Sequence, residues 1–177
     1  FGFGLEGHIR AHAHKLFGIL NGVDYGEWSP KNDDKIVSTY SQKDISGKLL
    51  CKRDLQKQFH LEQRDDVALI GFVGRFAKQK GIELIAESIE GLLAQDLQIV
   101  MLGAGEKWAE GFFSHIASRY SGKFALYAGY SDALAHKIEA GSDLFLMPSL
   151  FEPCGLNQIY SLAYGTLPIV RKTGGLD

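Results

Sequence analysis

Residues 67–73 read VALIGFV, an almost wholly apolar run that ends at Gly74. Such a run is typical of a strand buried on both faces of a parallel sheet. Residues 81–94 follow with the apolar spacing of a helix. The same unit recurs along the chain, with further strands predicted at 98–102, 124–128, 144–147 and 167–170 and further helices at 106–120, 132–140 and 156–164. Strands that alternate with helices through short turns predict an α/β fold with an open, doubly wound, Rossmann-like parallel sheet.

The composition is that of an ordinary globular protein. Of 177 residues, 45% are hydrophobic and 23% charged, which argues against disorder. The net charge of −2 leaves no basic surplus to neutralise a phosphate backbone, so we expect no nucleic-acid partner. No apolar run approaches the ~20 residues that span a bilayer, so we expect no membrane partner.

The first 66 residues lack the strand–helix alternation. They are turn-dense at 19–30 and polar beyond that, up to an exposed helix predicted at 48–58. We expect the end of a preceding domain and a linker over residues 1–22, and the sheet-bearing domain over 23–177. The chain opens on Phe1 and stops at Asp177, directly after a Gly-Gly-Leu, so we expect a piece of a longer protein whose second domain is incomplete.

The turn after the first strand carries two cations. Arg75 follows the strand, and Lys80 precedes the next helix. In doubly wound sheets ligands bind outside the carboxyl ends of the strands, and helix N-termini attract anions. Arg75 and Lys80 therefore suit a diphosphate. The alternative is a solvated basic loop without a ligand.

Tyr130 follows the third strand and could stack on a nucleobase. The alternative is a partly buried surface tyrosine. The tight turn at 103–105 (GAG) resembles a phosphate-approach turn, but this pattern usually marks only a turn.

The segment after the fourth strand, residues 147–157 (MPSLFEPCGLN), is the most informative one. Pro153 and Gly155 fix the backbone, so the Glu152 carboxylate would point into the crevice, while the N–H groups of Gly155 and Leu156 would face an anion. A carboxylate there can accept hydrogen bonds from sugar hydroxyls or stabilise positive charge that develops in a glycosyl transfer. The alternative role for Glu152 is helix capping.

The turn after the fifth strand, residues 172–176 (KTGGL), offers a hydroxyl and a flexible backbone near the same crevice.

The histidines and cysteines favour no metal or nucleophile site. His8, His12 and His14 include an i, i+4 pair, but further zinc ligands in fixed geometry are not evident, so we interpret them as surface residues. Cys154 has no histidine in its turn to activate it, which favours a packing or backbone-setting role. Cys51 lies in a polar helix and is interpreted as incidental.

Taken together, these turns resemble the bacterial glycogen synthase and plant starch synthase family. The run Glu-Pro-Cys-Gly-Leu together with Arg-x-x-x-Gln-Lys-Gly is highly specific. The matching segments span the chain in order: 2–7 with Glu6, 19–30, 75–81 (RFAKQKG), 102–105, 129–130, 148–157 and 164–176. Related retaining glycosyltransferases carry a second Glu eight residues after the first. Here that position is Tyr160, which favours the glycogen and starch synthase branch.

The resemblance implies one half of a two-domain GT-B glucosyltransferase that acts with retention. Arg75 and Lys80 would bind the donor diphosphate and stabilise the leaving ADP, and Glu152 would contact the transferred glucose. Tyr130 would stack on adenine. Phosphate or sugar would be held by Gly155, Leu156, Thr173 and Gly174.

The resemblance also implies the substrates and the setting. ADP-glucose would be the donor and an α-1,4-glucan (glycogen or starch) the acceptor, with no further cofactor. No metal is required, since two cations already neutralise the diphosphate. The parent's N-terminal domain is the expected partner, in the bacterial cytoplasm or in a plant or algal plastid.

The chain departs from the family's pattern in two respects, and two alternative functions stay open. Leu150 stands where the family has Arg, so one cation of the crevice is missing. The family's amino-terminal Lys-x-Gly-Gly-Leu loop and catalytic His lie outside the chain, so we expect the isolated chain to be inactive. The alternatives are a retaining glycosyltransferase that uses a UDP-sugar, and a non-catalytic module that binds nucleotide or glucan.

Overall fold

The computed structural model describes residues 4–19 and 21–177. Its sheet has five parallel strands in the order β3-β2-β1-β4-β5. They are β1 (Ala68–Val73), β2 (Leu97–Gly103), β3 (Phe124–Ala128), β4 (Leu144–Met147) and β5 (Leu167–Val170). The predicted fold class is confirmed, and the last three strands have the predicted bounds.

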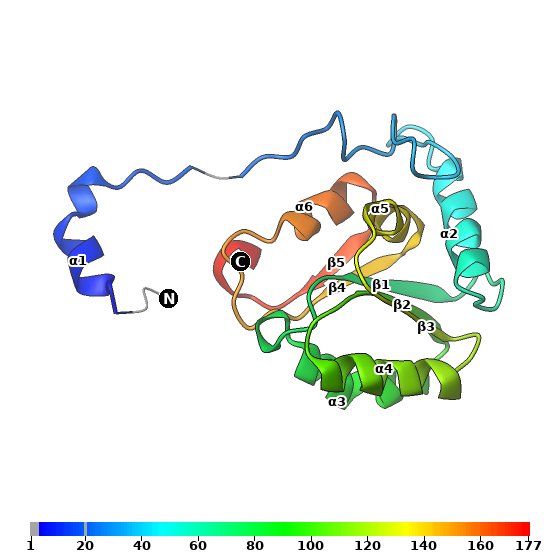
Figure 1. The fold of residues 1–177 in the computed structure, drawn as a ribbon. Coiled ribbons are helices and arrows are strands. Elements are labelled where there is room, and N and C mark those ends of the chain that lie inside the picture. The colour runs from blue at the N-terminus through cyan, green and yellow to red at the C-terminus, as the bar shows by residue number, and fades with distance from the viewer. Residues whose placement is uncertain (1–3, 20) are drawn as a thin grey trace.

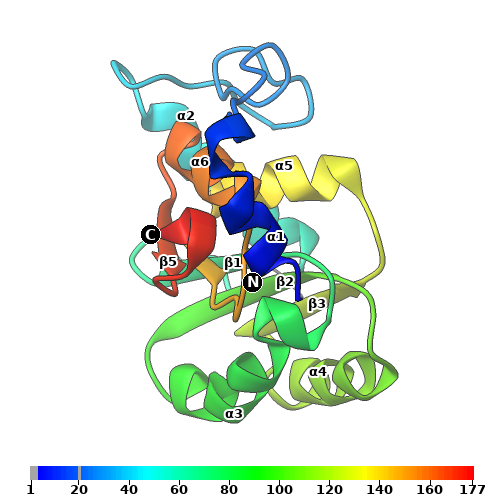
Figure 2. The same cartoon turned by 90° about the vertical axis from the view of Figure 1, so that its left-hand side faces the viewer.

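Helices cover both faces of the sheet (Figure 1). One face carries α3 (Ile82–Leu93) and α4 (Lys107–Arg119), and the other carries α2 (Ser46–Gln58), α5 (Asp132–Gly141) and α6 (Leu156–Ala163). The view in Figure 2 shows the same layering from the side, with α3 and α4 together below the sheet. None of the helices in the described ranges combines the length and apolarity needed to cross a bilayer.

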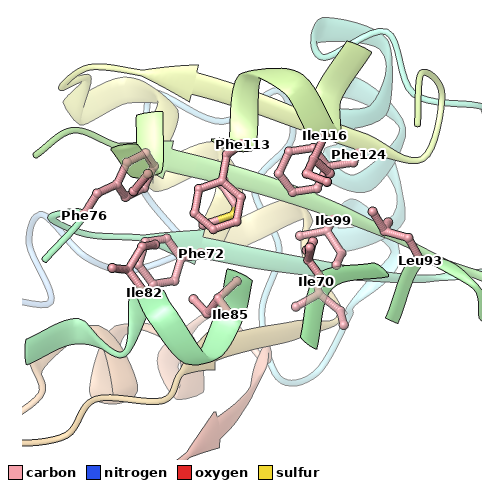
Figure 3. Packing of buried hydrophobic residues seen from close by; sticks show 13 residues of the cluster. Ile70, Phe72, Phe76, Ile82, Ile85, Leu93, Ile99, Phe113, Ile116 and Phe124 are labelled. Carbon is pink, nitrogen blue, oxygen red and sulfur yellow. The ribbon is translucent and has the colours of Figure 1, made fainter. Parts of the chain in front are cut away.

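The main core lies between β1 and β2 on one side and α3 and α4 on the other. Figure 3 shows Phe113 of α4 close to Phe76, with ring centroids 5.8 Å apart. Phe76 is fully buried, and its backbone N–H donates to the carbonyl of Ala104 at 2.8 Å. Because Phe76 follows Arg75 directly, this packing fixes the turn that carries the first predicted cation.

The α2 helix is less exposed than predicted. Leu55 is fully buried and Cys51 is 4% exposed, with its Sγ donating to the carbonyl of Ser38 at 3.2 Å. The prediction was wrong because two polar side chains lie on the buried face. Lys52 donates to the carbonyl of Val67 at 2.6 Å, and Gln56 donates to Gln98 Oε1 at 2.9 Å. The ammonium of Lys52 and the side-chain nitrogen of Gln56 are satisfied by hydrogen bonds, which lowers the cost of burying them, whereas Gln56 Oε1 is buried without a partner among the described residues.

The residues before α2 divide into two parts. The first part holds α1 (Glu6–Ala11) and η1 (Ala13–Lys15), which lie apart from the sheet and bury no side chain (Figure 1). The second part packs on the sheet-bearing body. The Trp28 ring stacks on His136 of α5 at 3.8 Å and on Tyr160 of α6 at 4.1 Å. We call Trp28, His136 and Tyr160 the aromatic clasp.

A buried polar cluster supports the aromatic clasp. Asp33 Oδ2 lies 2.8 Å from His136 Nδ1 and accepts a hydrogen bond from the Tyr164 hydroxyl at 2.5 Å. Burial and the neighbouring Asp33 carboxylate raise the pKa of Tyr164, so this hydroxyl stays protonated and donates. The Tyr40 hydroxyl donates to the carbonyl of Tyr164 at 2.8 Å. These contacts fasten residues 28–40 to α5 and α6.

Candidate functional site

The loops that follow the five strands gather at one edge of the sheet, because all the strands are parallel. Two adjoining cavities lie there, of about 350 Å³ and about 330 Å³. Lys80 and Asn157 line both cavities. Arg75 and Tyr130 line the first, and Glu152 lines the second. The structure therefore brings the three predicted catalytic residues to one place.

The centre of the site is an ion pair between Lys80 and Glu152. Lys80 Nζ lies 2.5 Å from Glu152 Oε2, and the two side chains are 25% and 10% exposed. The Ser149 hydroxyl, itself buried, donates to the same carboxylate oxygen at 3.2 Å. Glu152 is therefore held by the loop after β4 and by the turn after β1 together, and it does not act as a helix cap.

Gly81 permits this approach. Its φ is +73°, and a Cβ at this position would lie 2.2 Å from the carbonyl oxygen of Pro148. Only glycine fits both the left-handed backbone and the contact. The turn that carries Lys80, which includes η2 (Lys78–Lys80), thereby lies directly against the loop that carries Glu152.

Arg75 is exposed at the mouth of the first cavity. Its Nη2 donates to Gln79 Oε1 at 3.3 Å. In the part of the chain that the structure describes, Arg75 forms no ion pair with a carboxylate. Its charge is thus available to a ligand. Tyr130 lies at the lip of the same cavity with 89% of its surface exposed, so the expectation of a partly buried tyrosine does not hold.

The N-terminus of α6 opens next to Glu152. Gly155 is the N-cap at φ +79°, and no side chain caps the first turn that begins with Leu156. The first N–H groups of a helix lack partners within the helix and favour an anion.

The loop after β5 closes the site from the other side. The Gly175 N–H donates to the carbonyl of Glu152 at 2.8 Å, and a Cβ at Gly174 would lie 2.2 Å from the same oxygen. Thr173 Oγ1 donates to the carbonyl of Leu150 at 3.4 Å. Thr173 and Gly174 therefore lie beside the Glu152 backbone. This agrees with the prediction that the turn after the fifth strand lies near the same crevice. The short helix η3 (Gly174–Leu176) follows.

The sequence also made predictions about Cys154, Leu150 and the histidines near the N-terminus, none of which takes part in the Lys80–Glu152 ion pair. Cys154 is half-buried in the wall of the second cavity, and its backbone is the surface on which Gly175 packs. Leu150 is 36% exposed, and its N–H donates to the carbonyl of Gln79 at 2.9 Å. His8 and His14 are exposed, and His12 is half-buried.

Among residues 4–19 and 21–177, one group has the spacing of metal ligands: Glu27, Asp132 and His136. The ammonium of Lys35 lies 3.4 Å from His136 Nε2 and 3.3 Å from Asp132 Oδ2. The ammonium of Lys35 thus already contacts two of these three side chains, and a metal ion would have to compete with it for them.

Sequence reasoning did not find Gln79, Ser149 or Asn157. Asn157 Nδ2 donates to the carbonyl of Val73 at 3.1 Å and so ties α6 to the end of β1. All three lie inside the segments 75–81 and 147–157, but only the loop conformations show which partner each side chain reaches.

Comparisons with known proteins agree with the resemblance that the sequence motifs indicated. A family model described as "Glycosyl transferases group 1" matches residues 54–177. "Glycogen synthase 1" of Geobacter sulfurreducens is 61% identical over 177 residues, which are 100% of this chain and 35% of that protein. "Soluble starch synthase 1, chloroplastic/amyloplastic" of Solanum tuberosum is 47% identical over 99% of this chain and 27% of its own length.

A solved structure is similar over nearly the whole chain. It is the catalytic domain of Starch Synthase IV from Arabidopsis thaliana bound to ADP and acarbose, with a TM-score of 0.93 and 38% identity. The match covers 99% of this chain and 36% of that one. The chain thus spans about a third of the length of these relatives. The similarities confirm the resemblance that the sequence motifs indicated.

Proposed function

The chain belongs to the group 1 glycosyl transferases, and on that premise we propose that it is the donor-binding part of a glycogen or starch synthase. The parent protein would transfer glucose from ADP-glucose to the non-reducing end of an α-1,4-glucan, with retention of configuration. The observation that carries the proposal is the Lys80–Glu152 pair at 2.5 Å between two adjoining cavities at the carboxyl edge of the sheet. The names of the relatives and the ADP in the Arabidopsis neighbour support it.

Arg75 and Lys80 stabilise the leaving group in this mechanism. When the bond between glucose and the diphosphate breaks, negative charge accumulates on the phosphate oxygen, and two fixed cations lower the energy of that state. An ammonium has three N–H donors. Lys80 can therefore keep its contact with Glu152 and still donate to a phosphate oxygen.

Glu152 acts on the transferred sugar. A carboxylate has about four acceptor positions on two oxygens, and among the described residues the hydrogen bonds to Glu152 go to Oε2. The remaining positions accept hydrogen bonds from glucose hydroxyls. The negative charge also favours the positive charge that develops on the sugar ring in an oxocarbenium-like transition state.

The remaining predicted residues hold the donor. Tyr130 offers its exposed ring to the adenine base. The backbone N–H groups of Gly155 and Leu156, with Thr173 and Gly174, hold phosphate or sugar. Because two side-chain cations neutralise the diphosphate, the mechanism needs no metal and no further cofactor.

The rest of the parent completes the reaction. Its N-terminal domain, which we place before a boundary near residue 22, would face this domain across the cleft and supply further groups for the glucan acceptor. We assign the reaction to the bacterial cytoplasm, since relatives such as the Geobacter protein are bacterial, or to a plastid if the parent is from a plant or alga.

The test is transfer of radiolabelled glucose into glycogen by the full-length enzyme, with ADP-glucose and UDP-glucose compared at equal concentration. Calorimetric titration with each donor runs beside it, with Arg75→Ala as the control. We expect transfer from ADP-glucose, and weaker ADP-glucose binding by the variant. A preference for UDP-glucose would favour a different branch of glycosyltransferases. Donor binding without any transfer would favour a non-catalytic module.

A further inference from the structure

One side chain, Gln79, joins the turn that carries Arg75 to the loop that carries Glu152. Its Oε1 accepts a hydrogen bond from Arg75 Nη2 at 3.3 Å, and its Nε2 donates to the carbonyl of Phe151 at 3.1 Å. Its backbone carbonyl accepts from the N–H of Leu150 at 2.9 Å. The three contacts link the turn after β1 to the loop after β4.

We infer that Gln79 is a positioning residue, which acts through Arg75 and sets the guanidinium relative to the Glu152 carboxylate. The inference rests on the proposed function, because it assigns Gln79 a part in the same donor site. It adds a residue that lines neither of the two cavities and controls the geometry of Arg75, which lines the first.

The two cations of the site are restrained in different ways. Lys80 is held by a carboxylate, whereas Arg75 is exposed and is held by the neutral amide of Gln79. A neutral acceptor orients the guanidinium and leaves its full positive charge for the donor diphosphate. A long side chain without this restraint would sample many rotamers and would have to be ordered each time a donor binds.

The amide group is suited to both contacts at once. It offers a carbonyl oxygen to the guanidinium and an N–H to the Phe151 carbonyl. A carboxylate at position 79 could accept from Arg75 but could not donate to Phe151, and it would also neutralise the charge meant for the diphosphate. A methionine would keep the length of the side chain and lose both hydrogen bonds.

The experiment uses the full-length enzyme with Gln79→Met, Arg75→Ala and the double variant. Gln63→Met, an exposed glutamine in the loop before β1, is the matched control. We expect Gln79→Met to lower kcat by about 10- to 100-fold, since a displacement of about 1 Å can cost about that much. The melting temperature should match that of the control. The double variant should be no slower than Arg75→Ala alone, because Gln79 acts through Arg75.

A second variant keeps the inference testable if Gln79→Met melts early. Gln79→Glu should raise the KM for ADP-glucose by about 10-fold, since its carboxylate pairs with Arg75. The inference is overturned if Gln79→Met keeps kcat within about twofold of the control, if the losses of Gln79→Met and Arg75→Ala multiply in the double variant, or if Gln79→Glu leaves KM unchanged. Wild-type transfer of glucose is measured in the same series, so an inactive wild type refutes the proposed function separately.

Discussion

Replacing Lys80 by methionine removes the cation at the centre of the site and keeps the length of the side chain. Lys80 Nζ is 2.5 Å from Glu152 Oε2, and its side chain is 25% exposed, so its charge is only partly screened by water. A hydrogen bond to a charged group contributes about 1.5–3 kcal/mol. If Lys80 makes one such contact with the leaving diphosphate, kcat/KM for ADP-glucose should fall by about 10- to 150-fold.

Lys78→Met is the matched control, because Lys78 belongs to the same turn. Its side chain is 70% exposed, and its Nζ lies 3.6 Å from Glu83, a surface pair that contributes at most about 1 kcal/mol. Initial rates over a range of ADP-glucose concentrations, with the full-length enzyme, give kcat/KM for both variants. Melting curves then show whether Glu152, left without its cation, lowers stability. An equal loss of activity in both variants, or none in Lys80→Met, would refute the role assigned to Lys80.

Three further predictions follow from burial and exposure. Tyr130→Ala should weaken ADP-glucose binding in a calorimetric titration without a change in melting temperature, because the ring is 89% exposed; unchanged affinity would exclude base stacking. Glu139 is 1% exposed, its Oε2 has no hydrogen-bond partner among the described residues, and burial raises its pKa well above 4.5. The contribution of the protonated Glu139 carboxyl to stability is therefore lost as the pH rises through its folded-state pKa. The free energy of unfolding of Glu139→Gln, measured by urea titration, should therefore increase relative to that of the wild type as the pH rises above about 4.5. Parallel pH dependences of the two proteins would contradict this. Trp28→Ala should destabilise the protein by about 3 kcal/mol, the low end of the range for aromatic-to-alanine changes, because Trp28 is half-buried; an unchanged melting temperature would mean that the aromatic clasp does not stabilise the fold.

The elements of the sheet could be predicted because each carries its own local signal. The run at 67–73 and the periodic apolar positions at 81–94 need no distant contact to be recognised. The observed β1 begins one residue later than predicted, and the observed α3 is one residue shorter at each end. The burial of α2 carried no such signal. Lys52 and Gln56 mark its inner face as polar, and their partners at Val67 and Gln98 become visible only when the chain is folded.

The residues of the site also divide into those that the sequence predicted and those that it did not. The rule that ligands bind at the carboxyl ends of parallel strands was enough to group Arg75, Lys80 and Glu152, because the topology brings those loops together whatever their conformation. It could not find Gln79 or Ser149. The contact of Gln79 with Phe151 depends on the path of two loops whose residues are 72 apart in sequence. The contact of Ser149 with Glu152 is only three residues long in sequence, but it depends on the conformation of the loop after β4.

The aromatic clasp explains why this chain has a tyrosine where related enzymes carry a second glutamate. The Tyr160 ring stacks on Trp28 at 4.1 Å with an angle of 2° between the planes, and it lines neither of the two cavities at the site. A carboxylate in its place would lie against an indole ring and lose hydration without gaining a cation. Position 160 therefore serves the attachment of residues 28–40 to α6, the helix whose first turn opens beside Glu152. On the proposed function, Glu152 is the carboxylate that the described part of this chain offers to the transferred sugar, and its placement depends on Lys80, Ser149 and the Gly175 N–H.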